Sequence, residues 1–205
     1  MAESQEEEEN MDMDYAAYFQ DMKITGSYKG LEDTNPLMTQ RFGADPYAME
    51  YDGRVYFYMT GDIFEYDGEE IKDNTYGRIH QIHVISTADM VNFTDHGATP
   101  AAGSQGAAKW ANNSWAPAAA WKNIDGQDKF FLYFADGGGG IGVLTADSPT
   151  GPFTDPLGHG LVTRDVPTCA EVLWLFDPAV LVDDDGRAYM YFGGGVPEGK
   201  VSAPG

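Results

Sequence analysis

Basic residues are scarce in this sequence. The 205-residue chain has 12 Lys and Arg residues against 33 Asp and Glu residues, which gives a net charge of -21. Nucleic acids and anionic membranes are bound by basic surfaces. We therefore expect neither of them as a partner, whereas a neutral partner such as an oligosaccharide or polysaccharide is compatible with the charge.

Cysteine and long apolar runs are also scarce. Cys169 is the only cysteine, which excludes an internal disulfide framework and a multi-cysteine metal site. No run of about 18 apolar residues predicts a membrane span, and the first residues lack the regions that make up a secretory signal. We therefore expect a cytoplasmic protein, or an extracellular one if the N-terminus is incomplete.

The first 14 residues differ in composition from the rest of the chain. Residues 1–14 contain seven acidic residues and no basic ones, a pattern typical of a solvated, disordered tail. Residues 15–205 are expected to fold, because 42% of the chain is hydrophobic and its length suits one globular domain.

Short runs rich in Tyr, Phe, Val and Ile indicate β-strands. They are separated by turn residues such as Asp52-Gly53, Asp125-Gly126 and Asp185-Gly186. No stretch keeps a helical apolar period for long, so the predicted class is all-β. The predicted strands are Arg54–Thr60, Gln81–Ser86, Lys129–Ala135, Ile141–Thr145 and Arg187–Gly193.

Internal repeats predict the architecture. Three segments share an x-Pro pair, an apolar strand, a hairpin and an aromatic strand: DPYAMEYDGRVYFYMTG from Asp45, APAAAWKNIDGQDKFFLYFADG from Ala116 and DPAVLVDDDGRAYMYFGGG from Asp177. A second element with Thr-Ala-Asp and Phe-Thr-Asp follows the first two. Four-stranded units at this spacing predict β-propeller blades at about 35–100, 101–165 and 166–205. Because about two and a half blades cannot close a ring, we expect an N-terminal fragment of a propeller.

The residue before each repeated proline is the strongest candidate for chemistry. These residues are Asp45, Ala116 and Asp177, and each begins the blade strand that lines the central funnel. An aspartate there could serve only the turn, but Ala116 occupies the same place in the same motif. Two carboxylates directed into one concave site suit the hydrolysis of a glycosidic bond.

The segments FGADPYAMEYDGRVYFYMTGD, NNSWAPAAAW, LYFADGGGGIGVLTADSPTGPF and FDPAVLVDDDGRAYMYFGGG resemble the first three blades of glycoside hydrolase family 43. The family includes α-L-arabinofuranosidases, arabinoxylan arabinofuranohydrolases and β-xylosidases. The resemblance implies a five-bladed propeller and an inverting mechanism. It assigns Asp45 as the general base and Asp177 as the aspartate that orients the acid and raises its pKa. The general acid, a Glu, matches neither Glu171 nor Glu198 by position and is expected beyond this chain.

Aromatic residues beside these positions are candidates for sugar contact, since C–H groups of a sugar ring pack on aromatic faces. They are Trp115, Trp174 and Phe42, and Glu171 is a candidate for bonding a sugar hydroxyl. The alternatives are packing between blades for the aromatics and a solvated loop for Glu171. No cofactor or metal ligand set is identified, because the histidines lack ligand spacing, although the family resemblance allows a structural calcium ion on the propeller axis.

The function expected from these observations is the removal of terminal α-L-arabinofuranosyl or β-xylosyl units from arabinoxylan-type saccharides. The stretch from the FDP motif to the GGGVP segment, which ends at Pro197, resembles the arabinofuranosidase-type members more closely. The alternative from another class is a non-catalytic propeller that binds carbohydrate or protein. A Glu near the start of the next inner strand would distinguish the enzyme from the binding protein.

Overall fold

The computed structural model describes residues 38, 41–67, 70–74 and 76–195. The chain divides into two compact units, Met1–Thr39 and Gln40–Gly205, and the elements below all belong to the second unit. The acidic tail at 1–14, the predicted start of blade one near 35 and Glu198 lie outside the described residues.

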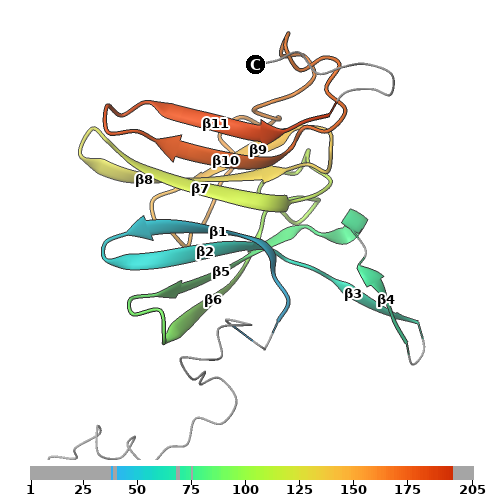
Figure 1. The fold of residues 1–205 in the computed structure, drawn as a ribbon, viewed down its shortest axis with the longest axis horizontal. Helices are drawn as coiled ribbons and strands as arrows, with labels where there is room; N and C mark the ends of the chain where they lie inside the picture. Colours follow the sequence, from blue (N-terminus) through green and yellow to red (C-terminus); the bar gives the residue numbers. More distant parts are fainter. Residues whose placement is uncertain (1–37, 39–40, 68–69, 75, 196–205) are drawn as a thin grey trace, which may run out of the picture. The chain divides into compact units, whose positions relative to one another are not determined.

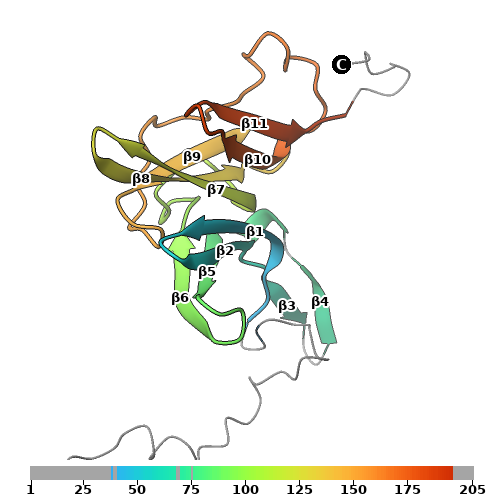
Figure 2. The same ribbon diagram turned by 60° about the vertical axis from the view of Figure 1, so that its left-hand side comes forward.

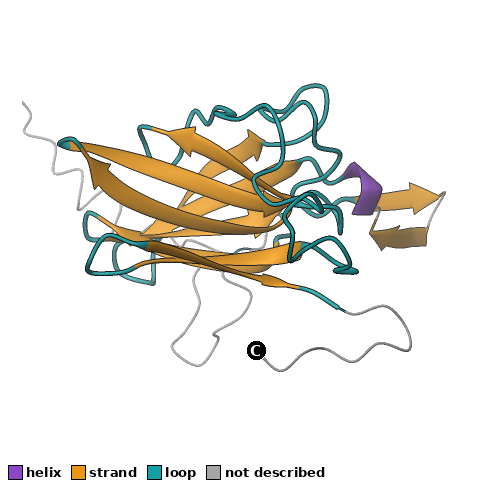
Figure 3. Cartoon of the chain, turned by 90° about the horizontal axis from the view of Figure 1, so that it is seen from above, coloured by secondary structure: helices purple, strands orange, loops and turns teal. Residues whose placement is uncertain are grey.

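Strands make up nearly all of the regular structure in the described part of the chain (Figure 3). There are eleven, accompanied by one short 3₁₀ helix, η1. The all-β class expected from the sequence is thus confirmed. The elements are β1 (Ala44–Tyr51), β2 (Arg54–Thr60), β3 (Phe64–Asp67), β4 (Glu70–Asn74), η1 (Tyr76–Arg78), β5 (Gln81–Thr87), β6 (Phe93–Pro100), β7 (Trp115–Ile124), β8 (Gln127–Ala135), β9 (Ile141–Ala146), β10 (Phe176–Val182) and β11 (Ala188–Gly193).

The three repeats form three separate antiparallel sheets, with the orders β1-β2-β5-β6, β7-β8-β9 and β10-β11. Strand β7 contacts β1 on one side and β10 on the other, so the first strands of the three sheets lie next to one another (Figures 1 and 2). This is the arrangement of successive propeller blades around their inner strands. Each sheet lies inside one of the three predicted blade segments, whose boundaries stay predictions.

The hairpin of β3 and β4 was not predicted from the sequence. It is inserted between β2 and β5, and it projects away from the first sheet (Figure 1). In the second sheet the matching connection between β8 and β9 is only the turn 136–140. Blade one therefore carries an extra element at the edge where β2 ends.

The repeat predicts four strands in each complete blade, and for blade two this prediction is wrong. The sheet ends at β9, and the following segment joins it at two isolated antiparallel bridges, Thr145 with Thr154 and Ile141 with Val162, without forming a continuous strand. Where blade one continues as β6, blade two has Pro156, which has no N–H to donate to a strand ladder. The Asp155 carboxylate accepts hydrogen bonds from the two amides at positions 157 and 158 instead, at 3.0 and 2.9 Å, and the chain leaves the sheet before it returns to Ile141 at Val162.

The largest cluster of buried residues joins blades one and two. It contains Tyr58 of β2, Ile82 of β5, and Leu132 and Phe134 of β8, which are at most 1% exposed. Each large apolar side chain buried in this way contributes about 1.5–3 kcal/mol. The Tyr58 hydroxyl also donates to the Pro149 carbonyl at 2.6 Å. This packing fixes β1 relative to β7 and so positions the residues that begin those strands.

Candidate active site

The residues before the repeated prolines occupy equivalent positions in the three blades. Asp45, Ala116 and Asp177 have φ values of 51°, 40° and 50°, and the strand register shifts at each of them. A non-glycine residue in this left-handed region costs about 1 kcal/mol or more. Because Ala116 adopts the same conformation, the strained backbone belongs to the bulge of the repeat and does not depend on a carboxylate.

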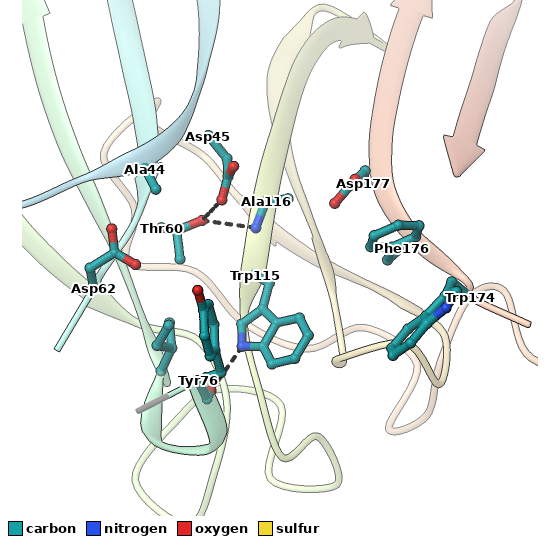
Figure 4. A pocket seen from close by; sticks show the side chains of 11 residues that line it. Ala44, Asp45, Thr60, Asp62, Tyr76, Trp115, Ala116, Trp174, Phe176 and Asp177 are labelled. Atoms are coloured by element: carbon teal, nitrogen blue, oxygen red, sulfur yellow. Dashed lines mark hydrogen bonds between the residues drawn. The ribbon is translucent and has the colours of Figure 1, made fainter. Parts of the chain in front are cut away.

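A cavity of about 790 Å³ lies where these three strands begin. Figure 4 shows Asp45 of β1 and Asp177 of β10 projecting toward it, with Ala116 of β7 between them. Its lining residues are Ala44, Asp45, Thr60, Asp62, Tyr76, Ile79, Trp115, Ala116, Trp174, Phe176 and Asp177. The cavity thus unites the two predicted carboxylates and two of the predicted aromatics.

Phe42 and Glu171, which were also predicted to contact substrate, are not among the residues that line this cavity. Phe42 is 62% exposed and lies before β1. Beside it, the Arg41 guanidinium bonds His83 Nδ1 at 3.0 Å and Asp95 at 3.0 Å, which holds this segment against β5 and β6. Sugar contacts of Phe42 and Glu171 stay predictions.

A hydrogen-bonded chain links Asp45 to the neighbouring blade. The Thr60 hydroxyl at the end of β2 donates to Asp45 Oδ2 at 2.8 Å, and it accepts from the Ala116 amide at 2.9 Å (Figure 4). Thr60 is only 2% exposed. One oxygen of the Asp45 carboxylate is therefore held from the protein side of the cavity.

The pKa of Asp177 is raised above the ordinary value of an aspartate. Partial desolvation of the Asp177 carboxyl group, whose side chain is otherwise exposed, raises its pKa, and the negative charge of Asp45 raises it further. A second carboxylate close enough to have this effect disfavours ionisation of both groups together. The charge of Asp45 therefore acts on Asp177 across the cavity, and perturbed carboxyl groups of this kind are common in functional sites.

Trp115 and Trp174 form aromatic walls. Trp115 donates through Nε1 to the Tyr76 carbonyl at 3.0 Å, and its ring meets the Tyr76 ring edge to face at 6.0 Å. Trp174 is 47% exposed and lies over Gly138, where a Cβ atom would be 2.2 Å from its ring. These faces offer packing surfaces for the C–H groups of a sugar ring.

The sequence interpretation missed Thr60, Asp62 and Tyr76. A signal existed for Thr60, because the β1–β2 pairing places it opposite Ala44, just as Ala135 lies opposite Trp115 and Gly193 opposite Phe176. Aligning the ends of the second strands shows a hydroxyl in blade one alone. Tyr76 follows the inserted hairpin and has no counterpart in the repeat.

The part of the chain that the structure describes contains no group of three or more His, Cys, Asp or Glu side chains that could hold a metal ion. No ligands can therefore be named for an axial calcium ion. Burial lowers the pKa of His83, and the adjacent Arg41 lowers it further, consistent with a neutral ring that accepts the arginine hydrogen bond. None of the helices in the described part meets the length and hydropathy needed to cross a membrane.

Successive β-propeller sheets thus surround a cavity that has two carboxylates at their inner edge and aromatic walls. The model of the family "Glycosyl hydrolases family 43" matches residues 34–203, and the chain belongs to this family. The family and the all-β propeller fold expected from the sequence are both confirmed.

Individual relatives are similar at high identity. The chain is 59% identical over 172 residues to an arabinoxylan arabinofuranohydrolase of Paenibacillus polymyxa, covering 80% of this chain and 27% of that protein. It is 58% identical over 176 residues to the arabinoxylan arabinofuranohydrolase of Bacillus subtilis (strain 168), covering 82% of this chain and 34% of that protein.

A solved structure gives the same result. The crystal structure of a family 43 arabinoxylan arabinofuranohydrolase from Bacillus subtilis in complex with cellotetraose matches with a TM-score of 0.79 and 56% identity. The match covers 86% of this chain and 38% of that one. The chain thus spans about a third of the length of the relatives it matches.

Proposed function

We propose that this chain forms the first part of an inverting glycosidase that removes terminal α-L-arabinofuranosyl units from arabinoxylan-type saccharides. The observation that carries the proposal is the placement of Asp45 and Asp177, which face one cavity from equivalent positions of two blades. The blade between them has Ala116 at that position. The fold therefore tolerates a side chain without charge there, and the two acids serve chemistry.

Asp45 is the proposed general base. Inversion requires a carboxylate that takes a proton from water on one side of the anomeric carbon and an acid about 6.5–9.5 Å away on the other. Thr60 holds Asp45 Oδ2, which leaves Oδ1 to receive the proton. No glutamate is among the described residues that line the cavity, and we place the general acid in the part of the propeller that this chain does not span.

Asp177 is the proposed orienting aspartate. Its raised pKa follows from burial and from the charge of Asp45, so a further acidic group beside it would hold its own proton more tightly for the same electrostatic reason. The preference for arabinofuranosyl over xylosyl units is supported by the two relatives at 59% and 58% identity, which are arabinoxylan arabinofuranohydrolases.

The test uses an extended protein in which this chain is followed by the C-terminal blades of the Bacillus subtilis relative. We expect it to hydrolyse an aryl α-L-arabinofuranoside faster than an aryl β-xyloside, and NMR should show inversion at the anomeric carbon. The 205-residue chain alone should show little activity, since none of the described residues that line the cavity is a glutamate. Retention of configuration would contradict the proposal.

Asp45→Asn in the extended protein tests the role of the base. An amide cannot accept the proton from water at neutral pH, and loss of general base catalysis costs about 10²- to 10⁴-fold. Asp52→Asn is the matched control, because Asp52 lies in the β1–β2 turn with φ 49° and asparagine tolerates this conformation. The base assignment fails if both variants keep wild-type turnover.

A further inference from the structure

The Thr60 hydroxyl has a forced direction of hydrogen bonding. A backbone amide can only donate, so the hydroxyl oxygen accepts from Ala116 N at 2.9 Å. The single hydroxyl proton is then given to Asp45 Oδ2 at 2.8 Å. Thr60 is almost completely buried, so water does not compete for either bond. The threonine is thus built to present a donor to an acceptor on Asp45.

The repeat shows that the fold does not need this hydroxyl. The strand pairing places Ala135 of blade two and Gly193 of blade three where blade one has Thr60. Blades two and three nevertheless form the same bulge, with a positive φ at Ala116 and at Asp177. A hydroxyl therefore occurs at this position only in the blade that carries the proposed base.

The two bonds fix the base in two respects. The bulge sets the backbone of Asp45, and the Thr60 bond limits rotation of its carboxylate, so that one oxygen is occupied and the other is directed toward the cavity. The bond to Ala116 also ties the base to β7, where Trp115 begins the aromatic wall. A misplacement of about 1 Å costs on the order of 100-fold in rate, so such constraints matter.

We infer that Thr60 is a positioning residue that orients the Asp45 carboxylate and sets its place relative to the aromatic wall of Trp115. The inference rests on the proposed function, because it concerns the residue that acts on water. It goes beyond the two carboxylates in assigning a role to a neutral side chain of β2. Thr60 acts through Asp45 and does not itself contact the bond that breaks.

The experiment compares Thr60→Val, Thr60→Ala and Thr60→Ser in the extended protein. Valine keeps the shape of threonine without the donor, alanine reproduces the residue of blade two, and serine keeps the hydroxyl. Valine and alanine should lower kcat on the order of 10- to 100-fold with KM within about threefold, because binding by the aromatic walls is retained. Serine should keep kcat within about threefold of wild type.

A double-mutant cycle separates positioning from a structural role. If Thr60 acts through Asp45, Thr60→Val should change the residual kcat of the Asp45→Asn variant by less than about twofold. An equal fractional loss in both backgrounds would overturn the inference. Thermal unfolding shows that each variant is folded, and the alanine variant gives the answer if the valine variant fails to fold.

The outcomes also separate this inference from the proposed function. If Asp45→Asn abolishes turnover while Thr60→Val and Thr60→Ala keep wild-type kcat, the role of Thr60 alone is overturned. If serine loses as much kcat as valine, the hydroxyl is not what matters, and the inference fails as well. If Asp45→Asn keeps full turnover, the proposed base fails first.

Discussion

Blades one and two are built from the same motif, yet only blade one carries a carboxylate at its inner edge. Asp45 and Ala116 share the positive φ and the register shift before a proline. They differ in the side chain and in the residue beside it. Thr60, at the end of β2, donates a hydrogen bond to Asp45, whereas Ala135, at the same place in blade two, has no hydroxyl. The repeat therefore gives each blade one inward-facing position with a strained backbone, and the chemistry depends on which side chain occupies that position.

The segments that follow the second strand of each blade also differ between blades one and two. Blade one has the β3–β4 hairpin and η1 after β2, and Tyr76 of η1 reaches the cavity. Blade two has the tight turn 136–140, against which Trp174 packs. One blade thus adds a wall residue by insertion, whereas the other stays short enough to receive a side chain from the third blade.

The largest effect on kcat is expected when the carboxylate is moved from position 45 of blade one to position 116 of blade two. In the extended protein, Asp45→Ala combined with Ala116→Asp should remain about 10³-fold below wild-type kcat, as a base deletion does. The new carboxylate would have the correct backbone conformation, but it would project from β7 instead of β1, and Ala135 offers no hydroxyl to orient it. Initial rates on an aryl α-L-arabinofuranoside measure the effect.

The single variant Ala116→Asp is the control, since it adds a carboxylate while Asp45 stays in place. Recovery of inverting activity in the double variant to within about tenfold of wild type would show that a carboxylate at any inward-facing position serves as the base. That result would contradict the importance of Thr60 as well as the distinction between the blades.

A smaller effect is expected from closing the space behind Trp174. In Gly138→Ala the new methyl group would lie 2.2 Å from the Trp174 ring, so the exposed indole must swing away. We expect KM to rise about tenfold, equivalent to about 1.4 kcal/mol of sugar binding, with little change in kcat. Gly194→Ala is the control, because its methyl group would be in ordinary contact with Val172 at 3.5 Å. An unchanged KM in Gly138→Ala would remove Trp174 from the binding surface.

Strand positions followed from the sequence wherever aromatic and polar residues alternate. β2 was predicted with its observed bounds, and β5, β8, β9 and β11 to within two residues at either end. The β3–β4 hairpin was missed because the alternation of Phe64–Asp67 is only four residues long and Glu70–Asn74 has a single apolar residue. In blade two, the repeat predicted a continuous fourth strand, but the segment that contains Pro156 pairs with β9 only at two isolated bridges.

The candidate site was predictable in part, because the x-Pro motif itself marks Asp45 and Asp177. Distance along the chain was a poor guide to the other residues. Trp174 and Phe42 each precede a carboxylate by three residues, but only Trp174 lines the cavity. The bridge between Gly139 and Leu175 holds the residue that follows Trp174 in place. Thr60 differs from its counterparts when the ends of the second strands are aligned, but its bond to Asp45 depends on strand register and tertiary pairing.

The smallest effect concerns the folding free energy and the interaction between blades one and three. The raised pKa of Asp177, caused by burial and then by Asp45, means that the folded protein holds this proton more tightly than the unfolded chain does. Stability from this group is therefore present at low pH and is lost as pH rises from the ordinary value of 3.8 through the higher folded pKa. Asp177→Asn removes the titrating group, so the extended variant should be more stable than wild type at neutral pH, and the difference should disappear below the ordinary value.

The gain should not exceed about 0.5 kcal/mol, because the carboxyl group is exposed and water screens its repulsion with Asp45. Urea unfolding across this pH range measures it, and Asp184→Asn, which removes a charge from the turn after β10, controls for the loss of charge on the same blade. A stabilised variant with impaired turnover would show that the second carboxylate is kept at the cost of stability, as in other sites where function opposes folding. If Asp177→Asn is instead less stable than wild type at neutral pH, the carboxylates do not repel one another across the cavity, and the pairing of blade one with blade three that the proposed mechanism requires would be wrong.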